Sequence, residues 1–298
     1  MPQRYGGIDR IGTIASVTMA EESRLIPAWR LLDREGLHAL VDAPRRGLPD
    51  GIFLTPNRAP HEISAVPLVM AARQVIERAD AQGGLPLTAT GALSRADTRA
   101  LFELIDWPDY AKNEVLAVNR VLSEADALPV HITRIVLQVA GLLRRRGKVL
   151  IATKKAQTLL TPNASADLFA LLFETTLWRV SLSYFDRAPV EHWPQDHIGI
   201  VLWCISVAAC DWEDTDLLTQ VCTVRDENLD RTVRDFSGYA MRSRVLRPLT
   251  WFGLMEMARR GDETQADWVR PPVYRKTALF DAVVGFKIAV PVRTGVLH

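Results

Sequence analysis

Basic side chains are concentrated in one segment of this sequence, where no carboxylate balances them. Between Ala127 and Ala166 the sequence holds seven Lys and Arg residues and no Asp or Glu. They are Arg134, Arg144, Arg145, Arg146, Lys148, Lys154 and Lys155. Cations gathered in this way can neutralise the phosphates of a nucleic-acid backbone, and Arg or Gln on a helix can bond to base edges. The segment is therefore predicted to bind DNA or RNA.

The spacing of apolar residues predicts three helices that position this charge. Ser94 and Asp97 have the form of a capping box at the start of the first helix. The second helix is expected to bury a stripe made of Val115, Val118 and Leu122. The third helix covers about residues 129–140, because proline suits a first turn and glycine suits a helix end.

A β-hairpin is predicted directly after the third helix. Residues 142–146 and 148–153 read as two short strands about a turn at Gly147. The side chains expected to contact nucleic acid are His131, Arg134 and Gln138 on the outward face of the third helix, with Arg144, Arg145, Arg146, Lys148, Lys154 and Lys155 on or beside the hairpin. Three helices followed by a hairpin is the order of a winged helix, a helix-turn-helix variant.

A second, similar unit is predicted near residues 241–290. Leu249 precedes Gly253 by the spacing with which Leu137 precedes Gly141, and each copy continues through a basic stretch to a threonine. We therefore expect a mainly α-helical protein with short β-hairpins, built from winged-helix-like units that form a degenerate tandem pair. The predicted divisions are an N-terminal region over 1–84, a winged-helix-like unit over 85–162 and a C-terminal helical domain over 163–298.

Further helices are expected around residues 21–40, 64–82, 167–187 and 217–230. The longest uncharged apolar stretch, 198–210, is expected to be a buried helix, because it is too short to span a bilayer. No secretory signal is recognisable at the N-terminus. The sequence thus predicts a cytoplasmic protein without a membrane partner.

A metal or hydrolytic centre is the weaker alternative. His192 and His197 lie in a seven-residue stretch with Glu191 and Asp196, and such groups could bind zinc. The spacing matches no helical pair of zinc ligands, and Pro194 indicates a loop that caps the next helix. No nucleophile, base and orienting group occur at a recognisable spacing, so the sequence favours a protein that is not an enzyme and has no cofactor.

The composition leaves two classes of function open. With 36 basic and 35 acidic residues, the chain has no overall attraction for nucleic acid, so any such partner must use a local patch. The alternative is an adaptor or scaffold that binds itself or another protein through its apolar, Trp-rich second half. Arg greatly outnumbers Lys, which suggests GC-rich coding and a bacterial source.

One stretch of the sequence resembles a known bacterial family. The opening Leu85-Pro86-Leu87-Thr88-Ala89-Thr90-Gly91, followed by Ala140-Gly141-Leu142-Leu143-Arg144 and by Lys148 to Leu160, is similar to the Ri-plasmid open-reading-frame-three-like family of plasmid- and transposon-associated proteins. The resemblance covers roughly residues 85–260, and Ala156 stands where that family usually has glycine. It implies a helical protein with winged-helix-like parts and no assigned activity.

Overall fold

The computed structural model describes most of the chain between Pro27 and Ile288. The described residues are 27–42, 47–108, 110–119, 121–186, 192–222, 224–232, 235–262, 264, 266 and 269–288. The protein is mainly helical, and its described strands form three small antiparallel sheets. This confirms the predicted fold class of helices with short hairpins. No helix among the described residues is both long enough and apolar enough to cross a membrane.

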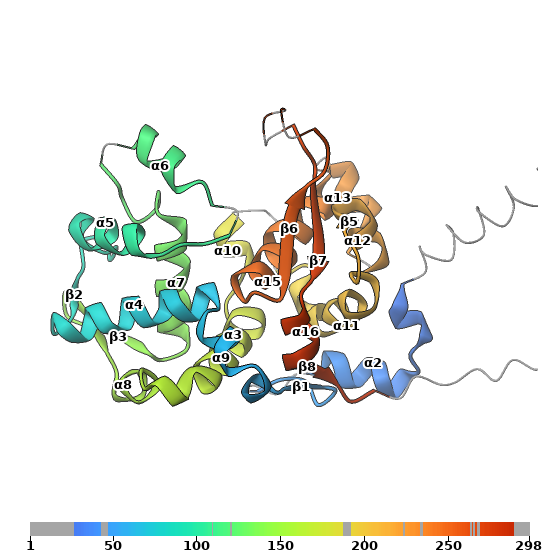
Figure 1. Ribbon diagram of the computed structural model, residues 1–298, viewed down its shortest axis with the longest axis horizontal. Coiled ribbons are helices and arrows are strands. Elements are labelled where there is room, and N and C mark those ends of the chain that lie inside the picture. Colours follow the sequence, from blue (N-terminus) through green and yellow to red (C-terminus); the bar gives the residue numbers. More distant parts are fainter. Residues whose placement is uncertain are drawn as a thin grey trace, which may run out of the picture.

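The first unit lies on the left of Figure 1 and contains the basic segment. Its elements are α4 (Pro67–Ala81), β2 (Leu85–Pro86), α5 (Arg95–Leu104), α6 (Lys112–Val118), α7 (Leu128–Val139), β3 (Leu143–Arg146), β4 (Val149–Ala152) and α8 (Lys154–Leu159). The sheet order is β2-β4-β3, so the short strand that follows α4 extends the hairpin on its β4 side. Helix α4 packs against α5, α7 and β4, although it precedes the predicted boundary at residue 84.

The second unit lies on the right of Figure 1 and repeats this order. Its elements are η5 (Gln195–His197), α11 (Ile198–Ala208), β5 (Glu213–Asp214), α12 (Thr215–Val221), α13 (Glu227–Thr232), α14 (Phe236–Met241), η6 (Arg242–Leu246), α15 (Arg247–Trp251), β6 (Met255–Arg259), β7 (Pro272–Lys276), α16 (Ala278–Val283) and β8 (Val284–Phe286). The sheet order β5-β7-β6 matches that of the first unit.

The remaining elements join and flank the two units. They are η1 (Ala28–Leu31), α2 (Arg34–Val41), β1 (Ile52–Leu54), η2 (Pro56–Arg58), α3 (Pro60–Ser64), η3 (Pro162–Ala164), α9 (Ser165–Glu174), η4 (Thr175–Arg179) and α10 (Ser183–Asp186). Strand β1 pairs with β8, which ties the N-terminal part of the described chain to its C-terminal part. Most of the buried apolar residues form one continuous core, and Trp107 stacks on Trp251 at 4.7 Å between ring centres.

The repeat suggested by the sequence recurs in the hydrogen bonding of both units. Gly141 and Gly253 end α7 and α15 with a positive φ, of 74° and 64°, which suits glycine. The hydroxyl of Thr153 donates to the carbonyl of Gly141, and that of Thr277 donates to the carbonyl of Gly253. Each threonine also caps the helix that follows it. The same two contacts therefore connect helix, hairpin and following helix in each unit.

Several local predictions are confirmed. Ser94 caps α5 and bonds to the carboxylate of Asp97, as the capping box predicted. The hairpin forms as expected, with Arg146 paired to Val149 across the turn. The apolar stretch after residue 198 is the buried helix α11.

Other local predictions are wrong. Helix α6 buries none of its residues, Val118 is 82% exposed, and the buried Leu122 lies beyond the helix end. The reason is visible in Figure 1, where α6 projects from the body of the first unit. The helix predicted over 217–230 is divided between α12 and α13.

Candidate functional site

The basic hairpin presents its charge to solvent. Arg144, Arg145, Arg146 and Lys148 are all exposed, and no carboxylate of the described residues pairs with them. The strand register places Arg144 and Arg146 opposite Ile151 and Val149, while Arg145 faces Leu150. Because cross-strand partners share a face, Arg144 and Arg146 lie on one side of the hairpin and Arg145 lies on the other.

Two of the predicted cations occupy a different element. Lys154 and Lys155 are not part of the hairpin but form the first turn of α8, where both are exposed. The hydroxyl of Thr153 accepts from the backbone N–H of Ala156 and so begins a helix at this point. The two lysines thus extend the basic surface beyond the end of β4.

The second hairpin differs from the first because much of its charge is neutralised. Arg275 bonds to Glu256 directly across the strands, at 2.7 Å, and its guanidinium lies 4.7 Å from the ring centre of Trp212. Lys276 pairs with Asp281 at 2.7 Å. The fold is repeated, but the unpaired basic hairpin belongs to the first unit.

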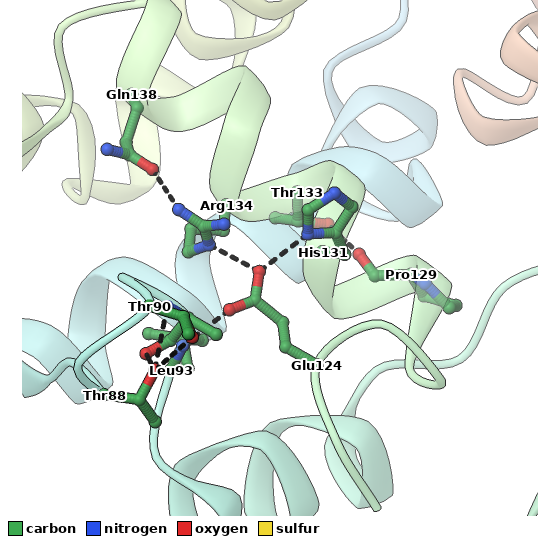
Figure 2. A network of polar contacts seen from close by, with 10 residues as sticks. Thr88, Thr90, Leu93, Glu124, Pro129, His131, Thr133, Arg134 and Gln138 are labelled. Carbon is green, nitrogen blue, oxygen red and sulfur yellow. Dashed lines mark hydrogen bonds and ion pairs between the residues drawn. The ribbon is translucent and has the colours of Figure 1, made fainter. Parts of the chain in front are cut away.

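The predicted outward face of α7 is covered rather than free. Arg134 is only 9% exposed. Its Nε donates to Oε1 of Glu124 at 2.5 Å, and its Nη1 donates to Oε1 of Gln138 at 2.5 Å. Figure 2 shows Glu124 reaching α7 from the preceding loop. The placement of Arg134 on an open helix face is therefore wrong, and this geometry does not support base reading by Arg134 and Gln138.

A single carboxylate organises this network, as Figure 2 shows. Oε1 of Glu124 also contacts Nδ1 of His131 at 2.7 Å, and Oε2 accepts from the backbone N–H of Leu93 at 2.6 Å. The side chain of Glu124 is 2% exposed. Burial alone would raise the pKa of Glu124, but the bonds from His131 and Leu93 and the charge of Arg134 together hold it below its ordinary value. The network ties the β2–α5 loop and the 121–127 loop to α7.

A cavity of about 560 Å³ adjoins the network. Its walls come from the loop after β2, from α7 with its preceding loop, and from α10, including Thr90, Gly91, His131, Ser183 and Tyr184. The carboxylate orients the imidazole, as a general base would require. Among the described residues, the hydrogen-bond partner found for the His131 ring is Glu124, and no hydroxyl bonds to it.

Acid should weaken the part of the stability that comes from Glu124. Because the folded pKa of Glu124 lies below its ordinary value of 4.5, its contribution is complete above that pH and is lost as the pH falls through the folded value. Urea unfolding of the wild type and of Glu124→Gln between pH 6 and pH 3 measures this. We expect the difference in stability between the two proteins to shrink towards the acid end. A difference that stays constant or grows would contradict the assignment.

The predicted metal candidates do not gather with other ligands. His192 and His197 lie on either side of Pro194, and Glu191 lies outside the described residues. Within the described part of the chain, no group of three or more His, Cys, Asp and Glu side chains is placed to hold a metal ion. His192 instead lines a small cavity with Gln195 and Asp196.

Sequence reasoning missed two features of these surfaces. Glu124 lies ten residues before Arg134 in a loop, so no helical spacing connects the two. The second feature is a set of arginines on and beside the helix that precedes the second hairpin, including Arg242 and Arg247. The sequence shows that Arg242 and Arg247 are near each other along the chain. Arg259 is a strand residue, and only the fold brings it to the same cavity.

Comparison with known proteins places the similarity in the first unit. Residues 64–166 match the family described as the Y4jL N-terminal domain. A protein of Sinorhizobium fredii named uncharacterized protein y4jL is 36% identical over 105 residues, which cover 35% of this chain and 48% of the relative. The chain thus matches about half the length of that relative. No solved structure matches significantly.

The matched segment contains the motifs on which the expected resemblance was based. Residues 85–91 and 141–144 fall inside it, but the family found is not the Ri-plasmid family that those motifs suggested. The match also begins earlier, at residue 64, and therefore includes α4. Over residues 64–166, this chain is similar to the Y4jL N-terminal domain.

Proposed function

We propose that this protein is a bacterial nucleic-acid-binding protein whose first unit is a winged helix with a basic wing. The observation that carries the proposal is the set of exposed, unpaired cations on the β3–β4 hairpin and the start of α8. The sheet order β2-β4-β3 supports it, because the hairpin of a winged helix pairs with a short strand between two preceding helices, here β2 between α4 and α5. We place the activity in the cytoplasm, where a nucleic-acid partner is available.

The mode of contact follows from the charge and from the covered helix. Arginines on both faces of the hairpin can approach phosphates from two sides, and such contacts carry little sequence information. Since Arg134 is held by Glu124, base reading by α7 would require this buried pair to open. The proposed binding is therefore electrostatic and weakly selective, through Arg144, Arg145, Arg146, Lys148, Lys154 and Lys155.

Removing the wing charges tests the proposal. Replacing Arg144, Arg145 and Arg146 together by Ala is expected to weaken binding to a labelled DNA duplex by at least about tenfold at low salt, because three phosphate contacts are lost. Fluorescence anisotropy gives the dissociation constants. The matched control replaces Arg30, Arg34 and Arg58, which are exposed on η1, α2 and η2, and thus removes the same charge elsewhere.

The two variants distinguish binding through the wing from attraction by the net charge of the protein. The control is expected to keep nearly wild-type affinity. If both variants weaken binding equally, the effect comes from net charge and the wing has no special role. If the wild type binds neither duplex nor single strand at low salt, the adaptor function is favoured instead.

The observation that supports the adaptor function is the projecting helix α6, whose Val118 is 82% exposed.

A further inference from the structure

Three arginines line one small cavity in the second unit. The cavity, of about 260 Å³, lies between the helix formed by α14, η6 and α15 and the β6–β7 hairpin. Arg242 and Arg247 come from the helix and Arg259 comes from β6, with Tyr239 and Ser243 in the same wall. None of the lining residues that the structure describes carries a carboxylate. Like charges held around one cavity repel each other, so this arrangement favours an anion.

The acidic residues near the helix leave Arg247 without a counter-charge in the described part of the chain. Asp186 forms an ion pair with Arg244, whose guanidinium donates to both carboxylate oxygens at 2.6 and 3.0 Å. Asp235 reaches Arg242 only at 3.6 Å, and its side chain is 51% exposed. Among the described residues, no carboxylate pairs with Arg247. The large cavity of the first unit differs, because Glu124 lies in its wall beside Arg134.

The backbone also holds these arginines in place. Residues Arg242–Leu246 form a π-helical turn within the longer helix, and such turns are frequent at functional sites. Arg244 lies inside that turn, is 1% exposed, and is fixed by Asp186 and the carbonyl of Trp193. Because Arg244 anchors the turn, the backbone of Arg242 and Arg247, on either side of Arg244, has a defined position. Arg242 and Arg247 therefore extend from a fixed stretch of helix to the same cavity.

We propose that this cavity binds a phosphate group. The guanidinium fork matches phosphate oxygens and donates paired, charge-assisted hydrogen bonds to them. A volume of about 260 Å³ lies just below the usual range for drug-sized ligands, so it suits a phosphate and its nearest substituent. The phosphate can belong to a nucleic-acid backbone or to a small phosphorylated compound. The site does not depend on the wing of the first unit and therefore stands apart from the proposed function.

Calorimetric titration with inorganic phosphate, at constant ionic strength, tests the site in the full-length protein. We expect saturable binding by the wild type. Arg247→Gln should weaken this binding at least about tenfold, the loss expected when a charged partner in a hydrogen bond is removed. Arg231→Gln is the matched control, because Arg231 is exposed on α13 of the same unit and outside the cavity. A folded wild type that takes up no phosphate, or equal affinities in all three proteins, would overturn the proposal.

Two further titrations identify the source of the phosphate. If it comes from a nucleic-acid backbone, Arg247→Gln should also weaken oligonucleotide binding, whereas ribose 5-phosphate should bind no better than inorganic phosphate. If it comes from a small compound, ribose 5-phosphate should bind more tightly than inorganic phosphate and oligonucleotide affinity should not change. The Arg144, Arg145 and Arg146 triple variant should retain inorganic phosphate binding in both cases. Loss of phosphate binding in that variant would contradict an independent site.

Discussion

Replacing Glu124 by Ala is expected to lower the free energy of unfolding by about 3–5 kcal/mol, the loss typical when one partner of a buried ion pair is removed. The carboxylate serves Arg134, His131 and the backbone N–H of Leu93 together, and its side chain is 2% exposed. Without it, the guanidinium of Arg134 remains largely buried beside Gln138 alone. Urea unfolding followed by circular dichroism measures the change.

Glu256→Ala provides the matched control for this prediction. It also removes a carboxylate from an arginine, but Glu256 and its partner Arg275 are 43% and 39% exposed. Water screens such a pair, so the expected loss is at most about 1 kcal/mol. Equal losses in the two variants would show that Glu124 does not organise a buried network.

Asp186→Ala is expected to destabilise the second unit by a similar amount, about 3–5 kcal/mol. Arg244 is the largest fully buried side chain in the described part of the chain, and Asp186 contacts it through both carboxylate oxygens. The variant leaves a guanidinium that is 1% exposed without its anion. Chemical unfolding gives the magnitude.

A double variant distinguishes an unpaired charge from lost packing. Asp186→Leu with Arg244→Met removes both charges and keeps apolar volume, so it should be less destabilising than Asp186→Ala alone. The single variants Asp186→Leu and Arg244→Met are measured beside it. If the stability lost by the double variant equals the sum of the losses in these two single variants, the two residues are not energetically coupled and the ion pair does not act as a unit.

The sequence was a good guide wherever a structure depends on local chemistry. The capping box at Ser94, the proline at the start of α7 and the glycine at its end act within a few residues, so their patterns can be read directly. The internal repeat was recognisable for the same reason, because a left-handed glycine and a capping threonine are needed at the same step in each unit.

The predictions that failed concern places where segments that are distant in the sequence pack against each other. The period of α7 places Arg134 on a polar face, yet Glu124 from a loop without a clear pattern covers that face. The stripe assigned to α6 failed because the helix ends before Leu122 and packs its other apolar residues only partly. The arginine cavity required β6 to lie beside the preceding helix. The spacing of residues along the chain predicts which side of a helix or strand is polar or apolar, but it does not predict which other segment covers that side.

The dependence of DNA affinity on salt tests the basic wing most directly. For duplex DNA, the logarithm of the binding constant falls with the logarithm of salt concentration by about 0.9 for each phosphate neutralised. We expect a slope that is shallower by about two to three units when Arg144, Arg145 and Arg146 are replaced by Ala, with no change for the Arg30, Arg34 and Arg58 control. Equal slopes for the wild type and the wing variant would contradict it.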